Sequence, residues 1–314
     1  MSEFDLIARI QSRASGHAAS GVVVGIGDDA AVIAPAAGHE IVATTDSLVP
    51  GRHFTDAWSA EEIGCLAARA NLSDVAAMGA RPRWALLTLT LPGVDEAWLD
   101  GFLDGFLAAL EQAGTALVGG NLARGPLNIG VQLLGEVPAG QAVLRSGGQA
   151  GDRIVVTGTP GDAAAALLLG EKAPAELLNR LRCPPARVRA GLALRDHAHA
   201  MIDISDGFAA DLNHLLSDDL GAEIDLDCLP ASPALKKSVP APEKRWPLQL
   251  QGGSDYELLA LVPPQTDIDR LQEKAGVALT ATGTVVDGGG IRFQSSQHAL
   301  PPLIVQGWDH FKND

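Results

Sequence analysis

The sequence is poor in aromatic and in basic residues. Phe, Trp and Tyr make up 4% of its 314 residues, so alanine and branched aliphatic side chains must build most of any core. Lys and Arg number 23 against 38 Asp and Glu, which gives a formal net charge of −15, and the basic residues form no cluster. Nucleic acid and anionic membrane surfaces attract basic patches, so we expect neither as a partner.

Two further absences bear on the compartment and on metal chemistry. The three cysteines include no CxxC pair, so the usual spacing of a zinc site is missing. No run approaches 18 apolar residues, and the opening MSEFDLIARIQSR is too polar for a signal peptide. We therefore expect a soluble cytoplasmic protein.

The chain does have acidic residues at the edges of apolar segments. In IDISDG (residues 202–207), Asp203 and Asp206 stand between a short apolar run and a helical pattern. Such a strand-to-helix junction is the usual ligand site of an α/β sheet. Similar acids occur in GIGDDAAV, TTDSLV, NLSDVAAMGA and GGSDYEL. Carboxylates are hard oxygen ligands that suit Mg²⁺, and Mg²⁺ held by acids usually serves substrate phosphates.

The charge balance supports this interpretation. A phosphate substrate would meet few side-chain cations here, so metal ions must supply much of the positive field that neutralises it. Acidic clusters would repel an anionic substrate unless metal ions were bound between them. The sequence therefore predicts Mg²⁺-dependent phosphoryl chemistry.

Asp74 is expected on the apolar side of a helix. Ser59 and Glu62 match a capping box, which predicts a helix from there to about Gly79. At about 100° per residue, Asp74 shares one face with Ile63 and other apolar positions. Such a carboxylate needs a metal ion, an arginine or backbone N–H groups as a partner, unless the helix ends before Asp74.

The order of the apolar segments predicts the fold class. The first half mixes alternating strands with two long helices and is typical of an α+β fold. The composition turns rich in Gly and Ala near residues 138–148, where we place the domain boundary. GGNLARGP (residues 119–126) is expected to be a loop, residues 185–199 a helix, and the stretch up to Pro247 a proline-rich excursion.

One glycine-rich turn is ambiguous. GTPGD (residues 158–162) follows a predicted strand and precedes a predicted helix. It either cradles a phosphate on its backbone N–H groups or is only a tight turn.

Taken in order, the motifs resemble those of the thiamine-monophosphate kinase family, in the superfamily of aminoimidazole ribonucleotide synthetase. The matching segments are GIGDDAAVI, TTDSLVPGRHF, NLSDVAAMGARP, GGNLARGPL, LRSGGQAGDRIVVTGTPGD, AMIDISDGFAADL and GGSDYELL. They span about residues 25–262, and the ordered set is specific. The resemblance implies two domains of mixed α+β and α/β class. In that family, the mixed sheet of the N-terminal domain pairs with the same sheet of a second copy to form a homodimer. The C-terminal domain is an α/β sandwich.

The resemblance also implies roles for domains and residues. Residues 1–140 would bind metal and ATP and form the dimer, and residues 141–314 would complete the nucleotide and substrate sites. The implied metal ligands are Asp29, Thr44, Thr45, Asp46, Asp74, Asn121, Asp203 and Asp206. The implied ATP contacts are Gly120, Asn121, Arg145 and Ser205, and the implied thiamine phosphate contacts are His53, Ser254 and Trp308. The co-substrate would be ATP, held with several Mg²⁺ ions.

Two positions depart from the family's usual residues. Asn121 stands where the family usually has Asp, so one metal site keeps an oxygen but loses a charge. Ser254 stands where the family usually has Glu, with Asp255 and Glu257 as neighbouring acids that could replace it. The alternatives are therefore another ATP-dependent member of the superfamily, or a catalytically weakened homologue that binds metal and nucleotide.

Several assignments have a purely structural alternative. Asp28 and Asp29 suit an Asx-type turn, Arg145 a salt bridge, His53 a solvated loop and Trp308 a core position. For the reaction itself we expect no general base, because the acceptor phosphate is already anionic near neutral pH. Transfer would be direct and in line, without a phosphorylated enzyme.

Overall fold

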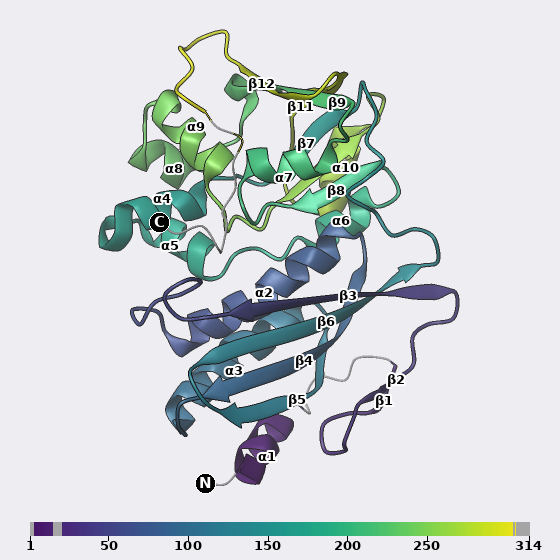
Figure 1. Ribbon diagram of the computed structural model, residues 1–314, viewed down its shortest axis with the longest axis vertical. Coiled ribbons are helices and arrows are strands. Elements are labelled where there is room, and N and C mark those ends of the chain that lie inside the picture. Colours follow the sequence, from purple (N-terminus) through teal and green to yellow (C-terminus); the bar gives the residue numbers. More distant parts are fainter. Residues whose placement is uncertain (1–2, 15–20, 304, 306–314) are drawn as a thin grey trace. The chain divides into compact units, whose positions relative to one another are not determined.

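The computed structural model describes residues 3–14, 21–303 and 305, and the chain divides into two compact units (Figure 1). The first unit holds residues 1–75 and 80–142, and the second holds residues 76–79 and 143–314. The separate functional roles expected for residues 1–140 and 141–314 stay predictions. Within the described residues, no helix is both long and apolar enough to span a membrane.

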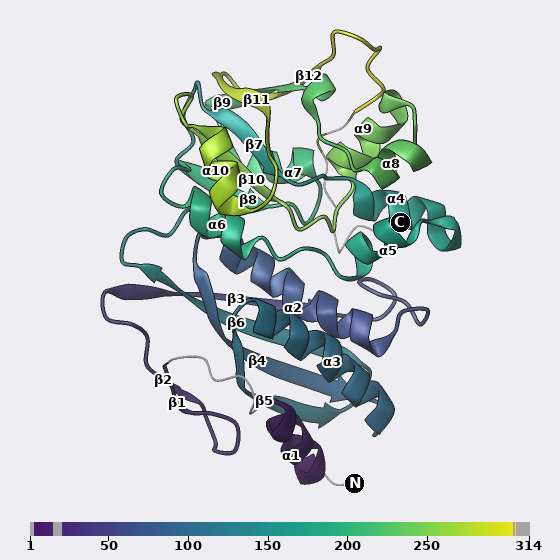
Figure 2. The same ribbon diagram turned by 180° about the vertical axis from the view of Figure 1, so that it is seen from behind.

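The first unit is built on a mixed sheet with helices on one face. Its elements are α1 (Glu3–Ala14), β1 (Val22–Val24), β2 (Val32–Ile33), β3 (His39–Leu48), α2 (Ala60–Ala77), β4 (Arg81–Leu91), α3 (Glu96–Gln112), β5 (Ala116–Arg124) and β6 (Asn128–Pro138). The sheet order is β3-β6-β4-β5, with β4 and β5 parallel and the other neighbours antiparallel. Helices α2 and α3 cover one face (Figures 1 and 2). This arrangement confirms the α+β prediction for the first half.

Local signals set the starts of the two long helices. The Glu62 N–H donates to Ser59 Oγ at 3.2 Å and the Ser59 N–H to the Glu62 carboxylate at 2.8 Å, which confirms the capping box. The Asp95 carboxylate accepts the Trp98 N–H at 3.0 Å and caps α3. Asp74 lies inside α2, so the alternative in which the helix ends before Asp74 is wrong.

The second unit is a six-stranded sheet of order β12-β9-β11-β7-β10-β8, antiparallel except between β12 and β9. Its strands are β7 (Arg153–Thr157), β8 (Ala200–Asp203), β9 (Leu220–Asp225), β10 (Leu258–Val262), β11 (Leu279–Asp287) and β12 (Gly290–Gln294). Its α-helices are α4 (Asp162–Leu169), α5 (Ala175–Arg182), α6 (Val188–Leu194), α7 (Phe208–Leu215), α8 (Pro233–Ser238), α9 (Pro242–Gln251) and α10 (Ile268–Ala275).

Both faces of this second sheet are covered. Alternate residues of β7 pack into two different hydrophobic cores, because successive side chains of a strand point to opposite faces of the sheet. Ile154 packs with Phe208 of α7 and Leu250 of α9, whereas Val155 packs with Leu194 of α6 and Leu271 of α10. A sheet between two helical layers confirms the predicted C-terminal α/β sandwich.

Three local predictions were wrong. Residues 119–124 belong to β5 rather than to a loop, because parallel pairing with β4 extends the strand. The helix expected over residues 185–199 is limited to α6. The proline-rich excursion contains α8 and α9, each of which has a proline in its first turn, where a missing N–H costs no hydrogen bond.

Candidate active site

Two carboxylates of the first unit, Asp46 and Asp74, form a pair. Thr44 and Asp46 share the face of β3 that α2 covers, and Thr44 Oγ1 donates to Asp74 Oδ2 at 2.6 Å. Burial, together with the charge of Asp74, raises the pKa of Asp46 to about 6. Two mutually repelling carboxylates, one of them bonded to a threonine hydroxyl, are an oxygen ligand set that a hard divalent cation would stabilise.

Thr45 faces the other way along the same strand. Thr45 Oγ1 donates to the Val131 carbonyl at 3.1 Å and accepts from the Gln132 amide at 3.3 Å. The structure therefore brings Thr44, Asp46 and Asp74 together but points the Thr45 side chain to the opposite face of the sheet.

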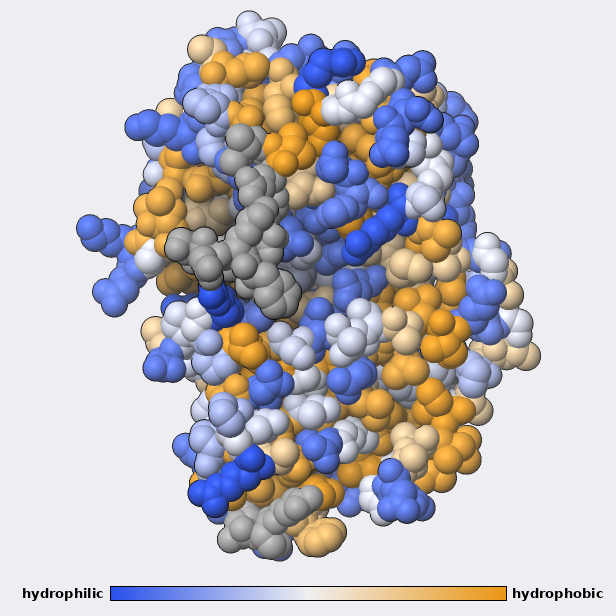
Figure 3. All heavy atoms as spheres, viewed as in Figure 1, coloured by the Kyte–Doolittle hydropathy of each residue, from blue (hydrophilic) through white to orange (hydrophobic). Residues whose placement is uncertain are grey.

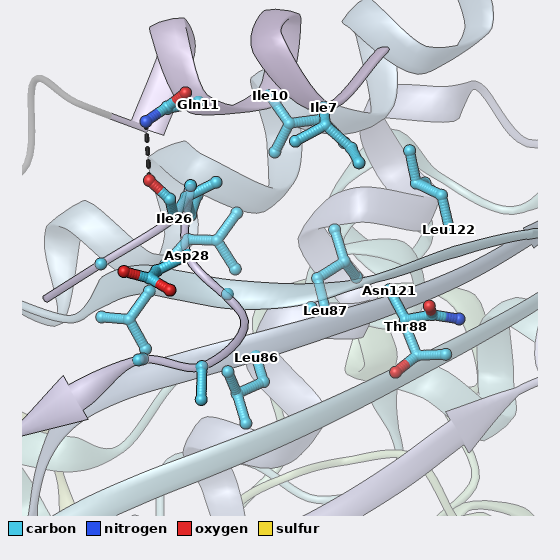
Figure 4. Close-up of a pocket in the computed structure, with 18 of the residues that line it drawn as sticks. Ile7, Ile10, Gln11, Ile26, Asp28, Leu86, Leu87, Thr88, Asn121 and Leu122 are labelled. Carbon is cyan, nitrogen blue, oxygen red and sulfur yellow. Dashed lines mark hydrogen bonds between the residues drawn. The ribbon is translucent and has the colours of Figure 1, made fainter. Parts of the chain in front are cut away.

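Three other predicted site residues, Asp29, Gly120 and Asn121, line a cavity of about 920 Å³ in the first unit. Its walls come from α1, the loop of residues 25–31 and the strands β4, β5 and β6. Figure 4 shows aliphatic side chains of α1 and of the sheet facing one another across it, with Thr88 and Asn121 at one side. The volume is that of a small-molecule site, and the lining suits an apolar ring with polar groups at its border.

The loop that carries Asp29 is fixed by two local bonds. Gln11 of α1 donates to the Ile26 carbonyl at 2.6 Å (Figure 4). The Asp28 carboxylate accepts the Asp29 N–H at 2.8 Å. Asp28 therefore bonds the N–H of the next residue rather than that of the residue two on, as an Asx turn would, and both acids line the cavity.

A β-bulge brings Gly120 and Asn121 to the cavity. The register of β5 on β4 slips between Ala85 and Leu86, which re-aims the residues that follow. A Cβ atom on Gly120 would lie 1.9 Å from the Leu87 carbonyl oxygen, so only glycine permits this close approach.

In the second unit, IDISDG forms the predicted strand-to-helix junction between β8 and α7. The carboxylate of Asp211, in the first turn of α7, accepts the N–H groups of Ser205, Asp206 and Gly207 at 3.0, 3.0 and 3.1 Å. Burial, with a smaller contribution from the charge of Asp206, raises the pKa of Asp211 to about 6 against the opposing effect of these N–H groups. Sequence reasoning missed Asp211, although an acid in a helix's first turn was the available signal.

The GGSDYEL segment lies against this junction. The Ser254 N–H donates to the Ser205 carbonyl at 2.8 Å and the Tyr256 N–H to the Ile204 carbonyl at 2.9 Å. The second unit therefore brings together Asp203, Ser205, Asp206 and Ser254 from segments about 50 residues apart in the sequence.

The two acids that could replace the missing glutamate, Asp255 and Glu257, are both buried. Glu257 is fully buried and paired with Arg180 and Arg187, and Asp255 is 2% exposed. Burial raises the pKa of Asp255 well above its ordinary value, whereas for Glu257 the opposing bonds and charge of Arg187 outweigh burial and lower the pKa. Glu257 is therefore occupied by the two arginines, whereas Asp255 Oδ1 is buried without a hydrogen-bond partner among the described residues.

The glycine-rich turn GTPGD is a tight turn rather than a phosphate cradle. The N–H of Gly161 donates to the Asp255 carboxylate at 2.8 Å, and Thr159 Oγ1 donates to the Asp162 carboxylate at 3.0 Å. The Gly161 N–H is therefore already bonded within the protein and is not available to hold a phosphate.

Two further predicted residues, His53 and Arg145, lie on loops. His53 Nδ1 accepts the Val49 N–H at 3.1 Å, so the imidazole is held in a turn rather than simply solvated. Arg145 is exposed and follows Leu144, whose carbonyl accepts the Met201 N–H at 3.0 Å. Trp308 lies outside the described residues.

Within the described part of the chain, no three His, Cys, Asp or Glu side chains gather into a ready-made metal cluster. The acids instead occur in smaller groups, among them Asp46 with Asp74 and the acids of the β8–α7 junction.

Comparison with known domain families defines the class of protein. Residues 27–137 match the N-terminal domain of AIR synthase related protein, and residues 149–296 match its C-terminal domain. The chain therefore belongs to the AIR synthase related protein family, and within it to the thiamine-monophosphate kinases, as the following relatives show. It is thus an enzyme of the kinase class.

The chain is 41% identical over 322 residues to the thiamine-monophosphate kinase of Escherichia coli (strain K12), with 98% of each chain covered. The crystal structure of the thiamine-monophosphate kinase from Stenotrophomonas maltophilia K279a has a TM-score of 0.85 at 41% identity, covering 93% of this chain and 96% of that one. A structure described as AaThiL complexed with AMPPCP and TMP has a TM-score of 0.75 at 31% identity, covering 98% and 97%.

Proposed function

We propose that this enzyme transfers the γ-phosphoryl group of ATP to thiamine monophosphate in a Mg²⁺-dependent reaction that yields thiamine diphosphate and ADP. The observation that carries the proposal is the oxygen ligand set of Thr44, Asp46 and Asp74. It occurs in a chain whose relative was found complexed with AMPPCP, an ATP analogue, and TMP.

The residues present suit Mg²⁺. Asp46 and Asp74 repel each other in a partly buried place, which favours a divalent cation between carboxylate oxygens over the empty pair. Asp29 and Asn121 at the cavity, and Asp203 and Asp206 at the β8–α7 junction, are the other proposed ligands. Mg²⁺ held by such residues would neutralise the phosphates and align them.

The reaction requires no general base. A phosphate oxygen of thiamine monophosphate attacks the γ-phosphorus, the bond from that phosphorus to the bridging oxygen breaks, and ADP leaves with the electron pair. His53 is consistent with this scheme, because Nδ1 already accepts the Val49 N–H. A neutral imidazole of this tautomer carries its proton on Nε2, so it offers a donor there. We propose direct in-line transfer.

The cavity is the proposed nucleotide site of the first unit, with Gly120 and Asn121 at its wall. Arg145 and Ser205 are the proposed nucleotide contacts of the second unit. His53, Ser254 and Trp308 are the proposed contacts of thiamine monophosphate.

We also propose that the enzyme is a cytoplasmic homodimer that pairs the open sheet faces of two first units. Val23, Val32 and Ile41 are large apolar residues of this unit exposed by 65%, 50% and 40%. Figure 3 shows apolar residues gathered on the side of the first unit where β1 and β2 lie. An exposed apolar area of this kind favours association.

The proposal is tested by incubating the purified protein with ATP, Mg²⁺ and thiamine monophosphate and separating the products by chromatography. We expect thiamine diphosphate and ADP in equal amounts. A phosphorylated protein trapped during turnover with γ-labelled ATP would contradict direct transfer. Nucleotide binding without thiamine diphosphate would contradict the kinase proposal and favour the weakened homologue, for which Asn121 and Ser254 are the specific observations.

A further inference from the structure

A buried charge cluster of the second unit is centred on Glu257, which immediately follows the site loop. The Arg187 guanidinium donates two parallel bonds to the Glu257 carboxylate, at 2.6 and 2.7 Å. Arg180 donates a further bond, and Thr157 Oγ1 donates at 2.5 Å. With two cations and a hydroxyl on a carboxylate that is 0% exposed, Glu257 has no surface left for a ligand.

The cluster ties together segments that are distant in the sequence. Thr157 ends β7, Arg180 belongs to α5, and Arg187 stands just before α6. Arg180 Nε also lies 3.5 Å from the Asp162 carboxylate at the start of α4. A side chain held from several elements at once fixes the backbone that carries it.

The backbone next to Glu257 is held in conformations that glycine usually supplies. Ser254 has a φ of 64° and Tyr256 a φ of 50°. Non-glycine residues keep such angles only where the surrounding contacts impose them, and such positions concentrate at functional sites. The contacts here are Asp255 with Gly161, Glu257 with its cluster, and the backbone bonds from Ser254 to Ser205 and from Tyr256 to Ile204.

The contacts that hold Asp255 and Glu257, here called the clamp, set the position of Ser254. It is the residue between the clamped part of the loop and the glycines, Gly252 and Gly253, and its N–H reaches the Ser205 carbonyl. Gly253 packs so closely there that a Cβ atom would lie 2.4 Å from that same carbonyl oxygen. A loop fitted this tightly transmits a shift at Glu257 to Ser254.

We propose that Glu257, held by Arg180 and Arg187, is a positioning residue that sets Ser254, the proposed acceptor contact, against the carbonyl group of Ser205. The catalytic consequence rests on the proposed function, in which Ser254 contacts thiamine monophosphate. Glu257 acts through the loop and does not touch the substrate. Of the proposed nucleotide contacts, Ser205 meets this loop through its carbonyl, whereas Gly120 and Asn121 line the cavity of the first unit. Loosening the loop should therefore weaken acceptor binding more than ATP binding.

The test replaces Glu257 by glutamine, which keeps the shape of the side chain and removes its charge. In Glu257→Gln we expect the KM for thiamine monophosphate to rise about tenfold and the KM for ATP to change less than about twofold. In the free enzyme we expect the amides of Ser254 and Tyr256 to exchange with deuterium at least about tenfold faster. The exchange measurement needs no substrate, so it tests the clamp even if the proposed reaction fails.

Two further variants keep the test decisive. If Glu257→Gln does not fold, Arg187→Lys retains the charge but cannot form two parallel bonds, and the same changes are expected. Glu223→Gln is the matched control, because it removes an exposed Glu–Arg pair (Glu223 with Arg292 at 3.2 Å) in the same unit. Unchanged amide exchange in the Glu257 or Arg187 variant, or equal increases in both KM values, would overturn the proposal.

Discussion

In the proposed metal site at the cavity, Asn121 is an uncharged ligand beside the charged Asp29. It lines the cavity together with Asp29 and offers an amide oxygen, which can bind Mg²⁺ but brings no charge. A carboxylate at the same position would add electrostatic attraction for the ion. In the proposed reaction, we therefore expect the residue at this position to set how much Mg²⁺ the enzyme needs.

Asn121→Asp should lower the Mg²⁺ concentration at half-maximal rate by about three- to tenfold, because one more ligand carries a charge. The measurement is a titration of the initial rate with Mg²⁺ at fixed ATP and thiamine monophosphate. Asn128→Asp is the control, since Asn128 is not among the described residues that line the cavity. Equal shifts in both variants would show that the added charge acts from a distance and that Asn121 is not a ligand.

Gly120 is required by backbone packing rather than by chemistry. Gly120→Ala should destabilise the enzyme by about 3 kcal/mol or more, because the new Cβ meets a strand carbonyl that cannot move freely. Urea unfolding followed by circular dichroism measures the change. In the control Gly93→Ala, the new Cβ would meet no described atom within 4 Å, so we expect little change. Similar losses in both would contradict this account of Gly120.

Single residues could be placed from the sequence only as far as local periodicity reaches. Helical spacing put Asp74 on the apolar side of α2 and so predicted that it has a partner. The identity of that partner, Thr44 at 2.6 Å, depends on which strand the helix packs against. Tertiary packing also buries Glu257 with Arg180 and Arg187, and no local pattern signals that pairing.

At the scale of elements, α1 fixes the loop that carries Asp29. Arg9 donates to the Asp100 carboxylate of α3 at 2.7 Å, and Arg13 pairs with Asp104 of the same helix. With α1 held on α3, Gln11 reaches the Ile26 carbonyl at 2.6 Å and holds the GIGDD loop at the cavity (Figure 4). A short N-terminal helix thereby helps to form the proposed nucleotide site.

Gln11→Ala should raise the KM for ATP about threefold to tenfold while the melting temperature falls by no more than a few degrees, because one exposed hydrogen bond is lost. Steady-state kinetics and thermal unfolding measure the two quantities. Gln112→Ala is the control, since Gln112 accepts an exposed bond from Arg69 and is not among the described cavity residues. An unchanged KM in Gln11→Ala would mean that the loop keeps its place without α1.

Elements with strong local signals were predictable, and those stabilised by pairing were not. The capping box and the apolar stripe of residues 59–79 predicted a helix, and the structure contains it as α2. GGNLARGP was expected to be a loop because Gly and Asn favour turns, yet β4 pairs with these residues and overrides that preference. Prolines suggested an excursion where α8 and α9 form, because proline at a helix start is compatible with the helix.

At the scale of the whole molecule, an enzyme with a net charge of −15 is proposed to bind two anionic substrates. Each unit has carboxylates among its proposed metal ligands: Asp46 and Asp74 in the first unit, and Asp203 and Asp206 in the second. Without cations these groups would repel the phosphates of ATP and of the acceptor. The central claim is therefore that metal ions held by these acids make the reaction possible.

The most direct test is the initial rate of thiamine diphosphate formation as a function of Mg²⁺ concentration in the natural enzyme, in Asp74→Asn and in Asp287→Asn. Asp287 is an exposed acid at the end of β11, so its variant controls for the loss of one charge. We predict no product in excess chelator for any of the three. We predict a Mg²⁺ requirement raised at least about tenfold, or a rate lowered at least about a hundredfold, in Asp74→Asn alone. Product formed in excess chelator, or a Mg²⁺ response of Asp74→Asn that matches that of the natural enzyme, would contradict the account.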